Sequence, residues 1–407
     1  MMYFVPSWYH GNEYKENEQY WYRRRTVTEF DDSVKQVQMF NRNNIMDYKI
    51  LNLSYCPNFR HFLHRQSVFH APYWSCFDAI QEIRRTKVDI LSYRDLMWPD
   101  HTEFVYTPFC IVAYVNNEKY AEIHFGEDGN MIEVFLFQSE IMVRKNVYDD
   151  RGFLSTTIVY ENNQPIYEQY LDEKGNWKLL HFFEDDHIEI NSENPYYLIG
   201  NKRFTFDSLN YDSMESLIEE VFSTYLDKMT DSTDIFCLAM HTLHHDLLES
   251  LFTQRKTILS FYQNRMELFE DAELKSLIRS TNYCIVDSKH KIGPLEKYAG
   301  KTLPIVDITP FDTRADFGIS QQLTVQNILV PIDSIEQSKL EALIVLFAKY
   351  FETNETARVH FFTRNANWDR VDSVLNFVRD VLKVNGLDER LALKETNDWY
   401  YVKKKDS

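Results

Sequence analysis

Residues 153–183 read FLSTTIVYENNQPIYEQYLDEKGNWKLLHFF and decide the fold class of the middle of the chain. Three runs rich in aromatic and β-branched residues are separated by ENN at 161–163 and DEKGN at 172–176, which favour turns. Short runs of this kind, with turns recurring about every 12 residues, are typical of neighbouring antiparallel strands. The stretch therefore predicts an antiparallel meander.

Similar runs continue on both sides, so we expect the antiparallel sheet domain to cover residues 102–207. The additional runs are FVYTPFCIVAYV, KYAEIHFG, MIEVFLF and HIEINS. Polar neighbours interrupt the apolar residues, as a sheet with at least one exposed face requires. Two interpretations of the aromatic residues stay open: they are structural, or an exposed sheet face binds sugar or protein. The candidates for such a face are Tyr160, Tyr167, Tyr170 and Trp177.

The regions on either side of this sheet alternate strand and helix patterns. Residues 1–101 contain the strand-like MYFVP and DYKILNLSY, with a helical apolar face at Phe30, Val34, Val37 and Phe40 between them. Residues 208–325 contain the strand-like DIFCLAM, KTILSFY, NYCIVDS and LPIVDIT, with helical segments between the first three. Such alternation predicts right-handed crossovers and a mostly parallel sheet. We therefore expect one α/β domain that the antiparallel sheet interrupts.

A second, small α/β unit is expected over residues 326–407. The strand-like NILVPID precedes a helix with an apolar face through Leu340, Ile344 and Phe347. The strand-like ARVHFFT and the helix-like WDRVDSVLNFVRDVL repeat the pattern, and a few strand-like residues follow.

Composition excludes several classes of function. The formal net charge is −18, whereas nucleic-acid and anionic-membrane surfaces are bound by basic patches. The five cysteines form no CxxC pair, which favours a reduced, cytoplasmic protein. No signal peptide or apolar run of about 20 residues is present, so any membrane association is expected to be peripheral.

The common cofactor motifs are absent. The Gly300-Lys301-Thr302 triplet resembles the end of a phosphate-binding P-loop, but Leu295 stands where the first glycine is needed. The sequence contains neither GxGxxG nor GxSxG, and only 10 glycines in all. We expect no cofactor.

The densest histidine cluster is MHTLHHD at 240–246, directly after a predicted strand. In an open parallel sheet, ligands bind outside the carboxyl ends of strands. His241, His244 and His245 have the spacing of one helical face, so zinc binding and general base catalysis are both conceivable. Three interpretations stay open: a metal site, a glycan-contacting or vestigial active site, and ordinary hydrogen-bonded histidines. We expect no metal, because nothing in the sequence supplies a further ligand.

A second candidate is TPFDTRADFGISQQLTVQNILVP at 309–331, which joins the two predicted α/β units. Its polar residues and single glycine are compatible with a ligand-binding loop or with an ordered inter-domain connection. The residues in question are Asp312, Arg314, Gly318, Ser320 and Gln321.

Three stretches resemble a known family: YFVPSWY at 3–9, RGFLSTTIVY with YEQYLDEKGNW at 151–177, and above all TPFDTRADFGISQQL at 309–323. They are similar to the first accessory secretory protein of the accessory Sec system, which exports glycosylated serine-rich repeat adhesins. The first two stretches are also similar to the glycosyltransferases that modify those adhesins.

The resemblance implies a GT-B-like fold, with two Rossmann-like domains and an extended antiparallel β-sheet domain inserted in the first. It also implies a non-enzymatic component that assembles with the second and third accessory secretory proteins and with the specialised SecA ATPase. The glycosylated adhesin is the implied cargo. The implied location is the cytoplasm, with peripheral association at the inner face of the membrane.

The alternative is an active glycosyltransferase, or the activating subunit of one, acting on the same adhesins. Related retaining enzymes hold the sugar nucleotide with two glutamates eight positions apart. None of Glu336, Glu341, Glu352, Glu355 and Glu389 has a glutamate eight positions later. Members of the family are generally longer, so we expect the second Rossmann-like domain to be partial, because of either removal or natural shortness.

Overall fold

The computed structural model describes two compact units, Met1–Phe311 and Asp312–Ser407. It describes all residues except 12, 16–19, 23–30, 46, 245–246, 248–250, 253, 264, 267–271, 309–325, 334, 352, 355, 364–367, 385–398 and 404–407. Each unit has its own apolar core. Among the described helices, none is long and apolar enough to span a lipid bilayer.

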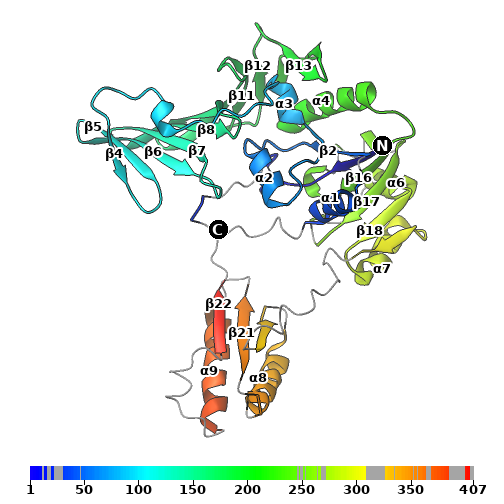
Figure 1. Cartoon of the computed structure of the whole chain (residues 1–407). Coiled ribbons are helices and arrows are strands. Elements are labelled where there is room, and N and C mark those ends of the chain that lie inside the picture. The colour runs from blue at the N-terminus through cyan, green and yellow to red at the C-terminus, as the bar shows by residue number, and fades with distance from the viewer. Residues whose placement is uncertain are drawn as a thin grey trace. The chain divides into compact units, whose positions relative to one another are not determined.

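The centre of the first unit is a parallel sheet of seven strands (Figure 1). Its chain begins at β1 (Met2–Val5), in the middle of the sheet. On one side lie β2 (Tyr48–Asn52) and β3 (Tyr73–Ser75). On the other side lie, in order, β16 (Ile235–Ala239), β17 (Lys256–Phe261), β18 (Tyr283–Val286) and β19 (Ile305–Asp307). The direction of strand addition therefore reverses between β1 and β16.

Helices cover both faces of this sheet, so its strands are apolar on both sides, as parallel sheets require. On one face, Phe4 packs with α1 (Asp32–Arg42) and α2 (Phe59–Arg65). On the other face, Tyr3 and Val5 join the core of the remaining helices. These helices are α3 (Cys76–Ile80), α4 (Met214–Met229), α6 (Ala272–Ser280) and α7 (Ile292–Ala299).

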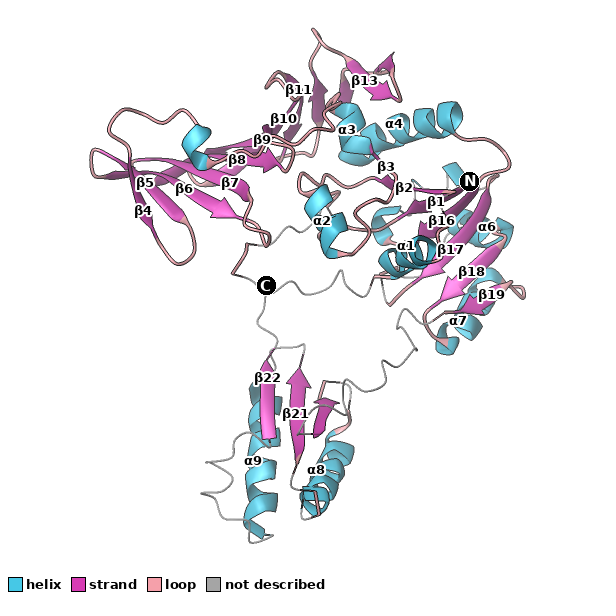
Figure 2. Cartoon of the chain, viewed as in Figure 1, coloured by secondary structure: helices cyan, strands magenta, loops and turns pink. Residues whose placement is uncertain are grey.

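The second sheet of this unit is antiparallel, has ten strands and projects away from the parallel sheet (Figure 2). Its strands run almost in chain order from β4 at one edge to β12 and β15 at the other. They are β4 (Glu103–Tyr106), β5 (Ile111–Val115), β6 (Glu118–Phe125), β7 (Met131–Gln138), β8 (Ile141–Asp149), β9 (Phe153–Glu161), β10 (Gln164–Leu171), β11 (Trp177–Phe182), β12 (Ile188–Ile190) and β15 (Asn210–Tyr211). A separate hairpin consists of β13 (Tyr196–Ile199) and β14 (Lys202–Thr205). The meander predicted from residues 153–183 corresponds to β9, β10 and β11.

Several details of the predicted sheet differ from the structure: β15 joins the sheet beyond residue 207, and the hairpin of β13 and β14 was not predicted. The run FVYTPFCIVAYV is two strands, because Thr107 forms a turn in which its hydroxyl accepts the backbone N–H groups of Phe109 and Cys110. Strand β8 was missed altogether. Its polar residues at 144–146 lie on both sheet faces, so the apolar alternation that identifies a strand is lost.

The triplet at Gly300 is the end of a helix rather than a phosphate loop. Helix α7, which the sequence did not predict, stops at Gly300, whose backbone is left-handed with φ 68°. Glycine is favoured there because it has no Cβ.

The second unit contains three parallel strands in the order β20 (Gln326–Pro331), β21 (Ala357–Thr363) and β22 (Trp399–Lys403). Helices α8 (Gln337–Phe351) and α9 (Trp368–Val384) connect them and contact each other. Their shared core includes Leu340 and Ile344, as the helical spacing predicted, together with Val359 and Phe361 of β21. The sequence-based assignment of the elements in this unit is confirmed.

Candidate functional site

The strongest positional candidate lies at the carboxyl ends of β1 and β16, where the strand order reverses. In open α/β sheets, this reversal leaves a crevice in which ligands bind. The chain after β1 supplies Ser7, Trp8 and Tyr9, and the chain after β16 supplies His241 and His244. Two of the three histidines expected at a carboxyl strand end therefore lie at the reversal point itself.

His244 is fully buried, and both of its ring nitrogens have partners. Nδ1 lies 2.8 Å from the carbonyl oxygen of Ala239. Since a carbonyl only accepts, Nδ1 carries the proton and Nε2 accepts the hydroxyl proton of Tyr9. Burial lowers the pKa of His244 to about 3, so the ring is neutral. This geometry matches the interpretation of an ordinary hydrogen-bonded histidine.

His241 differs from His244, because it is only partly buried. Its Nδ1 accepts the backbone N–H of Leu243 at 3.1 Å, and its ring lies 5.3 Å from that of Tyr9. Burial, followed by the positive charge of Arg265, lowers the pKa of His241 to about 4. Because Nδ1 accepts this bond, the proton of the neutral ring lies on Nε2, which can still donate one hydrogen bond to a ligand.

Arg265, in the loop after β17, holds the next polar cluster together. One terminal nitrogen of its guanidinium lies 2.6 Å from Ser7 Oγ and 3.1 Å from Asp31 Oδ2. The other lies 2.8 Å from Asp32 Oδ2. Asp31 also accepts the N–H of the Trp8 indole and caps the start of α1. The cluster therefore ties the loops after β1 and β17 to the first turn of α1.

The charges in this cluster do not cancel, since two buried carboxylates face one guanidinium. Burial, followed by the charge of Asp32, raises the pKa of Asp31 to about 6. Within the described residues, Asp32 Oδ1 and Arg265 Nε are buried without a hydrogen-bond partner. The cluster is thus largely buried, and its cation, Arg265, is already paired with Asp31 and Asp32.

Sequence reasoning missed Arg265, Asp31, Asp32 and Tyr9 as members of this site. A signal existed for each of the first three, because Asp31 and Asp32 begin an amphipathic helix and Arg265 soon follows a predicted strand. Tyr9 likewise follows the predicted strand MYFVP, but its contact with His244 spans 235 positions in the chain and could not be read from the sequence. Among the residues that the model describes, no three His, Cys, Asp or Glu side chains are placed to hold a metal ion.

The remaining cleft candidates fall outside the described residues. These are His245 and the loop residues Asp312, Arg314, Gly318, Ser320 and Gln321. Whether they contact a ligand stays a prediction.

The candidate sheet face is only partly supported. Tyr170 is fully buried, and its ring stacks at 5.7 Å on Phe77 of α3, so its assignment to an exposed face was wrong. The reason is the strand register, which gives Tyr167 and Tyr170 opposite faces of β10. Tyr160, Tyr167 and Trp177 are partly exposed and stay candidates.

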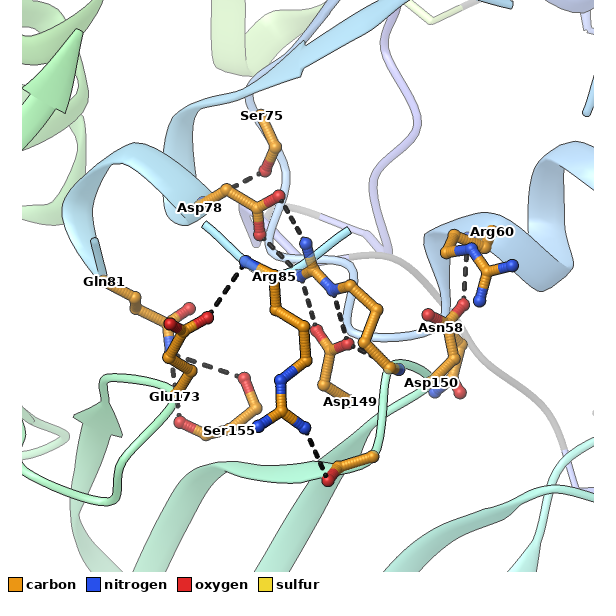
Figure 3. A network of polar contacts seen from close by, with 12 residues as sticks. Asn58, Arg60, Ser75, Asp78, Gln81, Arg85, Asp149, Asp150, Ser155 and Glu173 are labelled. Atoms are coloured by element: carbon orange, nitrogen blue, oxygen red, sulfur yellow. Dashed lines mark hydrogen bonds and ion pairs between the residues drawn. The ribbon is translucent and has the colours of Figure 1, made fainter. Parts of the chain in front are cut away.

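A second polar network fixes the antiparallel sheet to the helices of the parallel sheet (Figure 3). Arg151, in the turn between β8 and β9, makes two bonds of 2.7 and 2.9 Å to the carboxylate of Asp78 in α3. Its guanidinium also bonds to Asp149 at 2.7 Å. Next to it, Asp150 Oδ2 accepts the backbone N–H groups of Arg60 and His61 in α2. One four-residue turn therefore holds two helices.

Backbone contacts complete this junction. The amide of Gln81 donates to the carbonyl oxygens of Ser155 and Leu171, at 3.0 and 2.7 Å. Glu173 accepts the backbone N–H of Arg85 at 2.9 Å (Figure 3). These contacts join the antiparallel sheet to α2, α3 and the segment after α3, so the network is a structural junction.

A pocket of about 860 Å³ lies at the amino ends of the parallel strands, the opposite edge from the histidines. Its lining includes Asp227, Asp231, Arg255 and Lys256. Asp227 and Arg255 pair with each other at 3.3 Å.

Residues 1–405 match the family model of the Accessory Sec system protein named accessory secretory protein 1. The protein of that name from Streptococcus gordonii is 31% identical over 342 residues, covering 83% of this chain and 63% of the relative. The one from Staphylococcus aureus is 28% identical over 373 residues, covering 90% of this chain and 70% of the relative. The chain thus spans just under two thirds of its Streptococcus gordonii relative.

Solved structures are also similar to this chain. A chain of the Glycosylation Associate Protein (Gap123) complex from Streptococcus agalactiae is similar with a TM-score of 0.81 and 28% identity, covering 99% of this chain and 79% of that one. The pneumococcal O-GlcNAc transferase GtfA is similar in fold, with a TM-score of 0.63 and 9% identity, covering 100% of this chain and 76% of that one. The expected α/β architecture, related to GT-B glycosyltransferases, is confirmed.

Proposed function

Because the chain belongs to the family of accessory secretory protein 1 of the accessory Sec system, we propose that it is a non-enzymatic component of that export machinery. Its proposed cargo is the glycosylated serine-rich repeat adhesin. The match of residues 1–405 to the family model is the observation that carries this proposal. The proposed location is the cytoplasm, with peripheral association at the inner face of the membrane.

The proposed partners are the second and third accessory secretory proteins and the specialised SecA ATPase. Support for the first two comes from relatives whose structures were solved as assemblies. One is the Gap123 complex, and the other is the complex of accessory secretory proteins 1, 2 and 3 from Streptococcus pneumoniae, whose similar chain is 26% identical to this one with a TM-score of 0.80.

Two observations support a role without catalysis. The pair of glutamates eight positions apart that related enzymes use for the sugar nucleotide is missing from the sequence. At the strand-order reversal, His244 is fully bonded inside the protein and Arg265 is bound to Asp31 and Asp32. A base and a cation that are already engaged offer little to a reacting substrate.

We assign the proposed roles to the four expected segments, 1–101, 102–207, 208–325 and 326–407. In this proposal the interrupted first domain and the second domain provide the scaffold. The antiparallel sheet provides a binding face through Tyr160, Tyr167 and Trp177, and His241 is the histidine available for glycan contact.

Co-expression of the chain with the second and third accessory secretory proteins of the same organism tests the proposal. We expect a stable complex on gel filtration, and loss of adhesin export in cells from which the gene is deleted. Normal export in the deletion strain would contradict it.

The alternative function, an active glycosyltransferase or its activating subunit, is favoured by one observation: the fold similarity to the O-GlcNAc transferase extends over the whole chain. Incubation of the purified protein with UDP-GlcNAc and the unmodified adhesin, alone and with the adhesin glycosyltransferases, separates the two. Sugar transfer that depends on this chain would establish the alternative, and a double His241→Gln and Asp32→Asn variant would then be expected to reduce it.

A further inference from the structure

The antiparallel sheet ends in an edge strand that lacks protection. Strand β4 pairs with β5 only, among the strands that the model describes. An unpaired strand edge attracts other strands, and proteins usually block it with lysine, proline, a bulge or a very short strand. β4 has four residues, contains neither lysine nor proline, carries one charged residue, Glu103, at its start, and pairs regularly with β5.

The opposite edge of the same sheet is protected in the usual way. It ends in β15, which has only two residues. Ser213, two residues later, already caps helix α4, so the chain leaves the sheet at once. The two described edges of this sheet are therefore not equivalent, and β4 offers the longer pairing surface.

The register shows which backbone groups β4 presents. Thr107 N–H donates to the carbonyl of Cys110 at 3.0 Å, so this is a hydrogen-bonded pair of the antiparallel ladder. Bonded and non-bonded pairs alternate along such a ladder. Val105 opposite Val112 is then bonded, whereas Phe104 and Tyr106 belong to non-bonded pairs. The N–H and C=O groups of Phe104 and Tyr106 consequently point toward the open edge.

Apolar side chains surround this edge. Val105 is 48% exposed, Tyr106 61% and Phe109 57%. The ring of Trp21 is 50% exposed, and its N–H donates to the carbonyl of Phe109. A second strand laid along β4 would bury these side chains while it satisfied four backbone groups.

We propose that β4 is a docking edge to which a second protein adds an extended strand. This proposal rests on the proposed function, since it assigns the surface that contacts the second or third accessory secretory protein. Charge favours a different protein over a second copy, because two chains of net charge −18 repel each other. The added strand is accordingly expected to come from a neutral or basic surface, and recognition is mainly through the backbone.

A matched pair of substitutions tests the backbone contact. Tyr106→Pro removes the N–H that points outward and places a ring at the edge, while the bonds from β4 to β5 remain. Tyr106→Ala removes the same side chain and keeps the N–H. Binding to the purified second and third accessory secretory proteins is measured for the wild type and both variants, with thermal unfolding as a check on folding. We expect Tyr106→Pro to weaken binding at least about tenfold relative to Tyr106→Ala.

A second measurement does not depend on the variants. Hydrogen exchange at the amides of Phe104 and Tyr106 should slow when the wild-type chain enters the complex, because those amides become bonded. Equal binding by both variants, with unchanged exchange at these amides, would refute the docking edge and leave the proposed function intact.

Two further outcomes would each overturn part of the proposal. If the wild type binds neither accessory protein, the proposed function and this assignment both fail. If light scattering shows a wild-type dimer that Tyr106→Pro converts to a monomer, the occupant is a second copy and the proposed partner is wrong.

Discussion

At the residue scale, His244 shows how a histidine that looks functional in sequence can be structural. Its position after a parallel strand is typical of ligand-binding groups, yet the carbonyl of Ala239 and the hydroxyl of Tyr9 occupy both ring nitrogens. Of the two histidines of the cluster that the structure describes, His241 keeps an exposed part. The distinction depends on Tyr9, which is far away in the chain and near in space.

Tyr9→Phe should destabilise the protein. It removes the hydroxyl that His244 Nε2 accepts and leaves a fully buried acceptor without a partner, which costs about 1–3 kcal/mol in the free energy of unfolding. Tyr225→Phe is the matched control, because the buried hydroxyl of Tyr225 has no partner among the described residues. Urea denaturation of both variants decides: if they are equally stable, the hydrogen bond to His244 contributes nothing.

Stability should fall on acidification. The pKa of His241 is lowered to about 4 and that of His244 to about 3, so both stay neutral in the folded chain. The unfolded chain takes up both protons below about pH 6.5. The free energy of unfolding therefore decreases from about pH 6.5 to about pH 4, by up to about 1.4 kcal/mol per pH unit for each histidine.

Asp31 acts in the opposite direction. Its raised pKa of about 6 stabilises the folded chain below the unfolded value of 3.8, and this stabilisation is lost as the pH rises through 6. Urea midpoints at pH 7, 6 and 5 should give a shallower slope for His241→Gln and a steeper one for Asp31→Asn than for the wild type. Three identical slopes would show that these groups are not perturbed as described.

At the element scale, the turn between β8 and β9 determines how the inserted sheet is attached. Arg151 and Asp150 join it to α3 and α2, and a glycine between the turn and β9 allows close contact with the segment after α3. A Cβ on Gly152, whose φ is 91°, would lie 1.7 Å from the carbonyl oxygen of Asp89. The position therefore requires glycine for both conformation and space.

Gly152→Ala should be much more harmful than Gly175→Ala. Gly175 has a similar φ of 86°, but nothing lies within 4 Å of its Cβ position. Gly175→Ala should then cost only the backbone strain, about 1–2 kcal/mol. Gly152→Ala should cost at least about twice as much, because the backbone of Asp89 must move as well. Thermal unfolding of the two variants measures the difference, and equal losses would contradict the close contact.

At the scale of the whole molecule, two units with separate cores should respond separately to core damage. Leu340 of α8 is fully buried in the second unit, whereas Leu346 on the same helix is 61% exposed. Leu340→Ala should destabilise the second unit by about 2–5 kcal/mol, and Leu346→Ala should have little effect. Hydrogen exchange read by mass spectrometry should show the loss of protection only within 326–384. Increased exchange throughout residues 1–311 would show that the units unfold as one.

The sequence by itself determined the classes of element and their order. Alternating aromatic runs predicted the antiparallel sheet, and alternation of strands with helices predicted the parallel ones, because these patterns reflect which faces are buried. The gaps were local: the sequence did not predict β3, β8, the hairpin of β13 and β14, or α7, which ends at a glycine that resembled a phosphate loop. The stretches that resemble the family were also recognisable from the sequence alone.

Only the tertiary structure decided which polar and aromatic groups are available. Tyr167 and Tyr170 look alike in sequence, but the strand register buries one and leaves the other partly exposed. His241 and His244 also look alike in sequence, but Tyr9 from the loop after β1 occupies a ring nitrogen of the buried His244, whereas His241 stays partly exposed. Arg265 meets Asp31 and Asp32 across more than 200 positions of chain. The physical reason is that availability depends on contacts between distant segments, whereas the sequence pattern records only local burial.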